Sequence, residues 1–313
     1  MSVAMSSGNG YDARSVNQGA ANKGAVEWLR RAATAVPSLS GGVINILDLG
    51  SATGKNSASE LRAAVEAIRQ LQDGKHRDII VTHVAPSASI SLAYSGIAFH
   101  WISKSQPLSD FWIQHPRTED RATYLANQRQ AAADWVRLLE MRAAELLPGA
   151  HLVFTATTLK GSEPCQRTLE WFYDGWKEVL KLGLISQEEF QSLAGGHWLR
   201  SREEWLAPLE GSGELKDRFE VLEFQEHALS DPHWMEYVNG KGPQAEKARE
   251  LAEAYAGSMF GVGGGLLKGH LKQRSAAEVD KVLEVMRARF IELGSSEVIE
   301  FKMPFVLMVL RKK

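Results

Sequence analysis

The sequence has very little cysteine, no long apolar run and almost no net charge. Its single cysteine, Cys165, excludes a disulfide within the chain and a metal site made of several cysteines. No apolar stretch approaches the roughly 18 residues of a membrane span, and Met1–Asn9 lacks the apolar core of a signal peptide. A formal charge of −2 gives no reason to expect nucleic acid or an anionic membrane as a partner. We therefore expect a soluble, cytoplasmic protein without membrane insertion.

Strand and helix signals alternate along the chain. With 313 residues, 44% of them hydrophobic, it can bury a large core, as one elaborated domain or as two. Helical spacing of apolar residues predicts helices at Ala20–Ala35, Ser57–Leu71 and Asn127–Leu147, the last one stopped by Pro148-Gly149. This alternation implies an α/β protein with a mainly parallel sheet, whose last strand suits an antiparallel edge. The expected strands are Val43–Leu49, Asp78–Val84 (both buried), His151–Thr158, Phe219–Leu229 and Val298–Leu310.

A helical region rich in aromatic residues lies between these strands. Either its aromatics simply pack the helices together, or the helices form a cap with an apolar pocket over the carboxyl edge of the sheet. The run Gly261–Gly265 predicts a flexible hinge between two helices, because it has neither the preceding strand nor the Lys-Ser/Thr of a phosphate-binding loop. The expected helices are Gln166–Gly183, Ser186–Leu193, Ser201–Leu209, Pro243–Ala256 and Ala276–Leu293.

The most informative stretch is an apolar strand that breaks into a Gly-containing turn, Ile46-Leu47-Asp48-Leu49-Gly50-Ser51-Ala52-Thr53-Gly54, before the helix Ser57–Leu71. Such a turn brings the backbone and a helix N-terminus close to a ligand. The spacing D-x-G-x-x-x-G departs from the dinucleotide pattern G-x-G-x-x-G, because Ala52 stands in place of the middle glycine. The loop favours the type that holds the methionine part of S-adenosylmethionine, while another nucleotide and an ordinary strand-turn-helix remain alternatives.

Two further stretches add specificity to this loop. One is Gly10-Tyr11-Asp12-Ala13-Arg14-Ser15-Val16-Asn17-Gln18, and the other is the strand-like run Ser95-Gly96-Ile97-Ala98-Phe99-His100-Trp101-Ile102-Ser103. Together with the loop, and with the order of the later segments, they resemble the SABATH family of S-adenosylmethionine-dependent carboxyl methyltransferases. The resemblance spans nearly the whole chain. Among bacterial members it is similar to the mycobacterial-type fatty acid O-methyltransferases.

The resemblance implies a fold, a cofactor and a set of site residues. The fold is a mainly parallel, seven-stranded, Rossmann-like sheet with a helical cap. Residues 1–160, 217–230 and 295–313 would form the core that binds S-adenosylmethionine, and residues 161–216 and 231–294 the substrate-binding cap. A homodimer is among the expected assemblies. By matching positions, the cofactor would contact Tyr11, Ser15, Asp48, Gly50, Ser51, Gly54 and Asn56; Gln18 and Trp101 would be catalytic and bind the substrate carboxylate; His100 and Trp198 would also bind substrate.

One departure from the family lies between Val84 and Ala85. There the family has an acid that holds the cofactor ribose and a long loop beside the adenine, whereas this sequence passes directly into the segment before the Trp101 run. Either the protein has lost these contacts, or the sequence omits a segment of the natural chain. We favour omission, because a member without both contacts would bind its cofactor poorly. A measured mass well above 34.6 kDa would support it.

The chemistry expected of such a site is modest. A substrate carboxylate is ionised at pH 7, since its reference pKa is near 4, and it needs no general base. Gln18 and Trp101 would hold it in line with the methyl group of S-adenosylmethionine, so that a small lipophilic acid, such as a fatty acid, becomes a methyl ester. One alternative is N- or O-methylation of a heteroaromatic or phenolic compound, with His100 as base. Another is a catalytically silent binding protein. We expect no metal site, because the remaining histidines lack ligand spacing.

Overall fold

The computed structural model describes the chain except for residues 1–15, 38–41, 51–54, 72–76, 109–113 and 115–117. Its described strands form one sheet in the order β2-β1-β3-β4-β6-β5. Strands β2, β1, β3 and β4 are parallel, and β6 is antiparallel to both of its neighbours. The expected α/β fold with a mainly parallel sheet is therefore confirmed. The strands are β1 (Ile44–Leu49), β2 (Ile79–Thr82), β3 (Ile90–Gly96), β4 (Leu146–Thr157), β5 (Phe219–Ser230) and β6 (Lys302–Lys312).

The sheet differs from the expectation at both edges. The described residues form six strands where seven were expected. Strands β2 and β3 flank β1 and are joined by residues 83–89 alone, although a crossover between parallel strands ordinarily takes a dozen or more residues. This short connection, at the position where the sequence departs from the family, leaves no residues for a strand outside β2. Accordingly β2 is not buried as predicted, since Ile80 and Val81 are 50% and 44% exposed. At the other edge lies β5, so β6 is antiparallel but internal.

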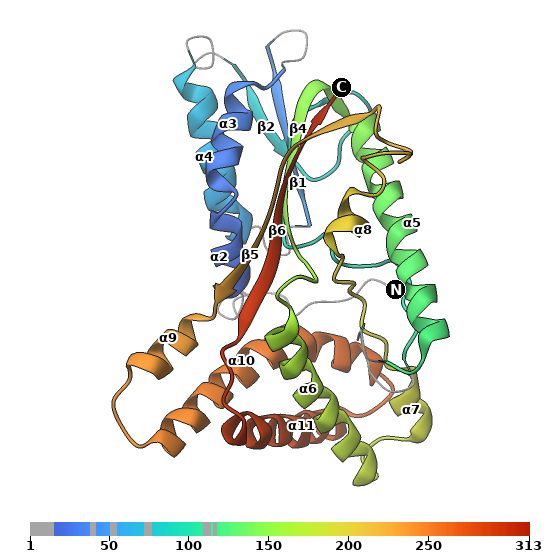
Figure 1. Cartoon of the computed structure of the whole chain (residues 1–313), viewed down its shortest axis with the longest axis vertical. Helices are drawn as coiled ribbons and strands as arrows, with labels where there is room; N and C mark the ends of the chain where they lie inside the picture. The colour runs from blue at the N-terminus through green and yellow to red at the C-terminus, as the bar shows by residue number, and fades with distance from the viewer. Residues whose placement is uncertain (1–15, 38–41, 51–54, 72–76, 109–113, 115–117) are drawn as a thin grey trace.

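Helices cover both faces of the sheet (Figure 1). On one face lie α2 (Val16–Lys23), α3 (Val26–Thr34) and α4 (Lys55–Gln70), and on the other α5 (Arg121–Glu145) and α8 (Arg202–Leu206). The predicted helix Ala20–Ala35 is divided in two by a turn at Gly24. Helix α5 ends before Pro148, because Leu146 already pairs with Ile90 of β3. One buried core lies on each face, around Leu29 and Ile68 on the first and around Trp135 and Phe154 on the second.

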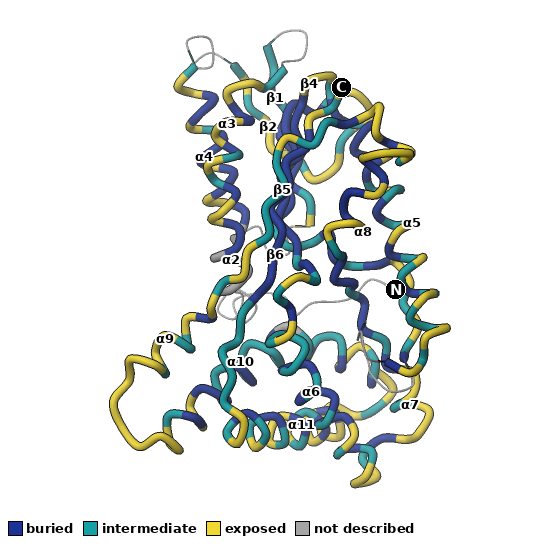
Figure 2. The backbone as a smooth tube through the Cα atoms, viewed as in Figure 1, coloured by how far each residue is buried: buried dark blue, intermediate teal, exposed yellow. Residues whose placement is uncertain are grey.

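The remaining helices gather beyond the carboxyl ends of the parallel strands (Figure 1). A third core joins α6, α10 and α11 around Trp171, Trp176 and Phe290. Helix α6 packs closely on α11 at Gly175, where a Cβ would lie 2.9 Å from the carbonyl oxygen of Met286. Figure 2 shows that this helical part is buried mainly along its inner faces, whereas α9 is largely exposed. These helices are α6 (Glu163–Lys181), α7 (Gln187–Ser192), α9 (Pro232–Asn239), α10 (Gln244–His270) and α11 (Ala276–Ser296).

The predicted hinge at Gly261–Gly265 is wrong, because these residues lie inside the continuous helix α10. Glycine in a helix interior costs about 1 kcal/mol relative to alanine, a penalty that packing can offset. Here the bare backbone faces a neighbour, since a Cβ on Gly263 would lie 3.6 Å from the Phe172 ring of α6.

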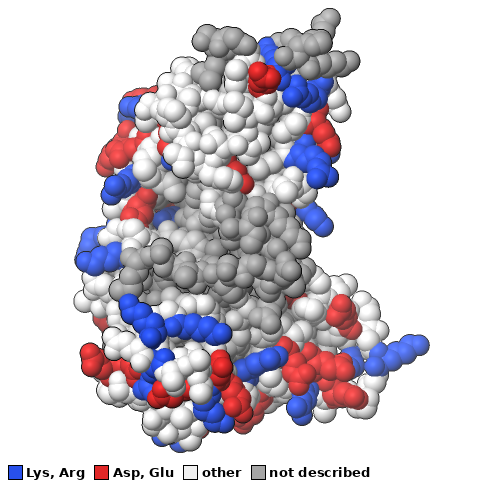
Figure 3. Space-filling model, turned by 180° about the vertical axis from the view of Figure 1, so that it is seen from behind, with Lys and Arg blue, Asp and Glu red and all other residues white. Residues whose placement is uncertain are grey.

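Within the described residues no helix is both long and apolar enough to cross a membrane. On the face shown in Figure 3, basic and acidic side chains are intermingled.

Candidate functional site

The carboxyl end of β1 carries the first group of predicted site residues. Asp48 is 3% exposed and accepts a hydrogen bond from Ser57 Oγ at 2.8 Å through Oδ2. Its other oxygen, Oδ1, is buried and has no hydrogen-bond partner within the described chain. Gly50 has a φ of +77°, and a Cβ at this position would lie 2.4 Å from the Cβ of Ala98. The ends of β1 and β3 therefore approach so closely that a side chain at position 50 does not fit.

This end of the sheet fits the cofactor that the loop predicts. The unpartnered Oδ1 of Asp48 can accept a hydrogen bond from a cationic ammonium group such as that of S-adenosylmethionine. On the neighbouring strand β3, Tyr94 pairs with Asp48, and burial together with the charges of Glu60 and Asp48 raises its pKa, so that it stays protonated. Of the other predicted cofactor residues, Tyr11, Ser15, Ser51 and Gly54 lie outside the described residues. Asn56 lies on α4, and Gln18, which was predicted to be catalytic and to bind the substrate, lies on α2, but the description does not extend to the side chains of these two residues.

The predicted substrate-binding segment follows β3. Ile97 has a φ of +52°, and the chain leaves the sheet there instead of continuing as the strand-like pattern predicts. The segment is held by Gly196–Arg200, which follows α7. The backbone N–H of Trp198 donates to the carbonyl of His100 at 2.8 Å, and that of Ile102 donates to the carbonyl of Gly196 at 2.8 Å. This pairing places Trp101 opposite His197 in an isolated antiparallel bridge.

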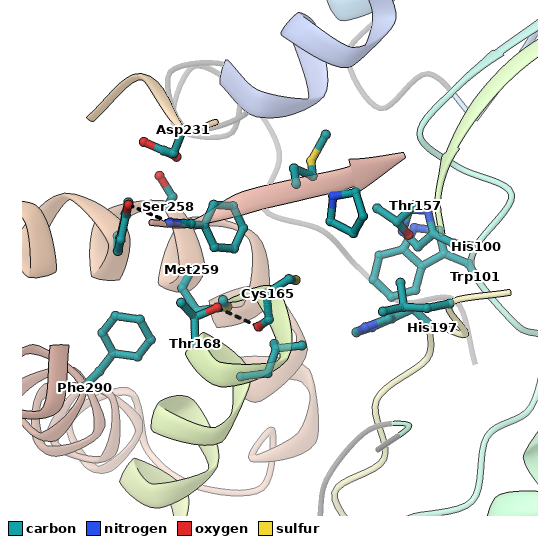
Figure 4. A pocket seen from close by; sticks show the side chains of 16 residues that line it. His100, Trp101, Thr157, Cys165, Thr168, His197, Asp231, Ser258, Met259 and Phe290 are labelled. Atoms are coloured by element: carbon teal, nitrogen blue, oxygen red, sulfur yellow. Dashed lines mark hydrogen bonds between the residues drawn. The ribbon is translucent and has the colours of Figure 1, made fainter. Parts of the chain in front are cut away.

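A cavity of about 180 Å³ lies between this segment and the helices (Figure 4). His100, Trp101 and His197 lie together at one end of it, whereas Asp231 and Ser258 lie at the other. The lining between and around these polar groups is largely apolar, with contributions from α6, α10, α11 and the start of β6. It includes Cys165, Leu169, Leu199, Met259, Phe290, Phe301, Met303 and Pro304.

The two histidines at the Trp101 end are neutral at pH 7. Burial lowers the pKa of His197 to about 4. Burial, together with the neighbouring His197 and Arg200, lowers the pKa of His100 well below its ordinary value. The ring of His197 stands edge-on to those of Trp101 and His100, at centroid distances of 5.9 and 6.2 Å. Nδ1 of His100 is buried without a hydrogen-bond partner within the described chain, so this end offers neutral imidazole nitrogens beside an indole N–H.

Two other candidate residues, Trp198 and Cys165, lie differently relative to the cavity. The ring of Trp198 packs against Ile102, Ala131 and Tyr124, away from the described lining of the cavity. Its neighbours His197 and Leu199 line the cavity instead, so this placement does not support Trp198 as a substrate contact. Cys165 does line the cavity, but burial raises the pKa of its thiol to about 12. A protonated thiol is a weak nucleophile, in agreement with a structural role.

Sequence reasoning missed several polar residues of the lining, among them His197, Thr157 and Ser258. His197 was grouped with the scattered histidines, since its proximity to Trp101 arises from a pairing between segments almost a hundred positions apart. Thr157 ends β4 at the same carboxyl edge as Asp48, a position that could have marked it. Ser258 lies inside a long helix, where no sequence signal distinguishes a cavity-facing serine.

Comparisons with known proteins place this architecture in a family. The family described as SAM dependent carboxyl methyltransferase matches residues 80–313. The probable 7-methylxanthine methyltransferase 2 of Theobroma cacao is 26% identical over 163 residues, which cover 47% of this chain and 44% of that protein. The probable jasmonic acid carboxyl methyltransferase 2 of the same organism is 24% identical over 231 residues, which cover 66% of this chain and 60% of that protein. The chain thus spans about half the length of such relatives.

A solved structure agrees with the fold. A loganic acid methyltransferase with SAH superimposes with a TM-score of 0.74 at 16% identity, over 99% of each chain. These relatives do not support the narrower similarity to bacterial fatty acid methyltransferases. Because the family match covers most of the sequence, the chain belongs to the S-adenosylmethionine-dependent carboxyl methyltransferases, the SABATH family.

Proposed function

We propose that this protein transfers a methyl group from S-adenosylmethionine to the carboxylate of a small lipophilic acid, giving a methyl ester. The observation that carries the proposal is the cavity, whose lining is largely apolar between two polar ends and which has the hydrogen-bonding groups His100, Trp101 and His197 together at one of them. An apolar body with a polar head matches that distribution. S-adenosylmethionine would supply an activated methyl group, so the acceptor needs orientation and dehydration more than activation.

Different residues of the chain would bind the cofactor and the acceptor. Asp48 would hold the cofactor through Oδ1, and Gly50 keeps the neighbouring backbone free of side chains. Trp101 would donate its indole N–H to one carboxylate oxygen, and Gln18 would donate to the same group. His197 is neutral at pH 7, so its ring N–H can donate a further hydrogen bond to the acceptor, and no imidazolium lies beside the acceptor. The helical part, residues 161–216 and 231–294, would act as a substrate-binding cap that excludes water.

The size of the cavity narrows the range of acids that can be the substrate. An apolar cavity of about 150 Å³ holds one benzene ring, and the volume here is about 180 Å³. Among the lipophilic acids expected from the sequence, this volume favours an aromatic-ring acid or a short-chain acid over a long fatty acid. The test is incubation with labelled S-adenosylmethionine and matched aliphatic and aromatic acids and their amides. Transfer of label into a neutral, extractable product with the acids alone supports the proposal. Transfer of label to the amides, or transfer to none of the compounds, contradicts it.

A second candidate is methylation of a ring nitrogen or a phenol. The specific observation in its favour is His100, because its buried Nδ1 has no hydrogen-bond partner within the described chain and could accept the proton that such an acceptor loses. The same labelling experiment, extended to purine-like and phenolic compounds, separates the two candidates. Transfer confined to these compounds would select the second. A protein that binds neither S-adenosylmethionine nor its demethylated product would instead be a silent member of the fold.

A further inference from the structure

A buried cation lies behind the Trp101 end of the cavity. Arg200 is 2% exposed and closes the segment that pairs with His100–Ile102. Its Nη1 donates to the carbonyl of Phe99 at 2.7 Å, and its Nη2 donates to the carbonyl of Ala131 in α5 at 2.8 Å. The guanidinium lies over the ring of Trp205, 4.9 Å from its centroid. Arg200 thereby ties the residue before His100-Trp101 to the helix that covers the sheet.

The charge of Arg200 is not compensated by contact. Buried charges in proteins are ordinarily paired, yet the described residues give Arg200 no ion pair, and its Nε has no hydrogen-bond partner among them. Two carboxylates, Glu204 and Asp134, act on this charge from a distance, but within the described chain they accept hydrogen bonds from uncharged donors and not from Arg200. Glu204 accepts hydrogen bonds from Gln128 Nε2 at 2.7 Å and from the N–H of Ser201 at 2.9 Å. Asp134 accepts from the N–H and the hydroxyl of Ser103, both at 2.7 Å.

This charge persists at neutral pH and reaches the cavity. Burial lowers the pKa of Arg200 to about 10, which leaves the side chain protonated at pH 7. The positive charge is among the causes that lower the pKa of His100, a lining residue of the cavity. In an interior of low dielectric, a fixed charge acts over several ångströms. An anionic group beside Trp101 would therefore be attracted to Arg200 without touching it.

We propose that Arg200 determines the charge class of the acceptor. It fixes the carbonyl of Phe99, and hence the position of Trp101, and its charge, which no described residue pairs by contact, favours an ionised carboxylate over an uncharged group in the Trp101 end of the cavity. Because the field is set before the acceptor arrives, no reorganisation is needed when it binds. The proposal rests on the proposed function, and it makes Arg200 a specificity-determining positioning residue that does not line the acceptor cavity.

The experiment compares one aromatic acid with its amide, by calorimetry on protein saturated with the demethylated cofactor. Arg200→Met removes the charge and both hydrogen bonds, Arg200→Gln removes the charge but keeps a donor, and Arg200→Lys keeps the charge. Arg202→Met is the matched control, since Arg202 lies two residues away on exposed α8 surface. We expect Arg200→Met and Arg200→Gln to bind the acid about ten-fold more weakly, which corresponds to about 1.4 kcal/mol, and the amide as before. Arg200→Lys and Arg202→Met should discriminate like the wild type.

Several outcomes would overturn the proposal. Equal losses for acid and amide would reduce Arg200 to a structural residue, and unchanged acid binding in both neutral variants would remove its electrostatic role. If Arg200→Met fails to fold, Arg200→Gln provides the same comparison. Loss of discrimination between acid and amide in Arg200→Lys would contradict a role for the positive charge. A wild-type protein that binds acid and amide equally would contradict the proposed function as well, whereas discrimination that survives in the neutral variants would contradict this proposal alone.

Discussion

In the proposed recognition of an acid, Trp101 would provide the hydrogen bond on which the recognition depends. It stands at the end of the cavity where His100 and His197 also lie, and its backbone is fixed by the pairing with Gly196–Arg200. The N–H of its indole ring is a donor only. A carboxylate accepts from such a group in either of its orientations, whereas an amide can turn its NH₂ group towards the indole. We therefore propose that Trp101 binds the charged acceptor and does not serve apolar packing alone.

The substitution Trp101→Phe removes this donor and keeps an aromatic ring. Hydrogen bonds to charged groups contribute about 1.5–3 kcal/mol, so we expect the affinity for an acid to fall about ten-fold to a hundred-fold. Binding of the demethylated cofactor should remain unchanged. Titration calorimetry measures both, and Trp28→Phe on α3 is the control, since Trp28 packs with the opposite core of the sheet. An acid affinity equal to that of the wild type would refute the assignment.

His197 makes a prediction about stability and pH. Its pKa in the folded protein is about 4, against 6.5 as the ordinary value, so the unfolded chain binds more protons between these values. Stability is then fully present above pH 6.5 and is lost as the pH falls towards 4, by roughly 3 kcal/mol for this group. His100 acts in the same direction. Urea unfolding at pH 7 and pH 4.5 should show a smaller difference for His197→Gln than for the wild type. Identical pH differences would contradict a buried neutral His197.

At the scale of elements, local pattern predicted most helices and strands, and long-range context decided the exceptions. The glycines of α10 look like a hinge in isolation, yet Gly263 faces Phe172 of another helix and the helix continues. The apolar residues of β2 look buried, but no described strand lies outside it. The run after β3 has the composition of a strand, but Ile97 adopts a positive φ and the segment pairs with Gly196–Arg200 instead. Each difference depends on residues that are distant in sequence.

The turn after β1 gives a prediction at this scale. Gly50→Ala places a Cβ in a left-handed conformation, which costs about 1–2 kcal/mol, and 2.4 Å from the Cβ of Ala98, where overpacking adds about 1–3 kcal/mol. We expect destabilisation of at least about 2 kcal/mol and weaker binding of the demethylated cofactor. Gly264→Ala is the matched control, because a Cβ there meets nothing within 4 Å and should stabilise α10 by up to about 1 kcal/mol. Denaturant unfolding measures both, and equal effects of the same sign would contradict the geometry.

At the scale of the whole molecule, the sequence predicted the family correctly, whereas the site residues that it suggested stay predictions. Asp48 was proposed from a motif at the end of a strand and Trp101 from the resemblance to the family, and the structure brings their segments to the same edge of the sheet through the contact of Gly50 with Ala98. His197 and Arg200 could not be predicted, because their proximity to Trp101 depends on how residues 196–200 return to the sheet. The burial that makes Arg200 informative is likewise a property of the folded chain.

The most direct test of the account is methyl transfer in a mixture of one aromatic acid and its amide, with labelled S-adenosylmethionine, for the wild type and for Trp101→Phe. We expect label in the methyl ester of the acid alone, at a rate at least about ten-fold lower in the variant, because one charge-assisted hydrogen bond is lost. Label in the amide product, or ester formation at the same rate in both proteins, would contradict recognition of a carboxylate at Trp101.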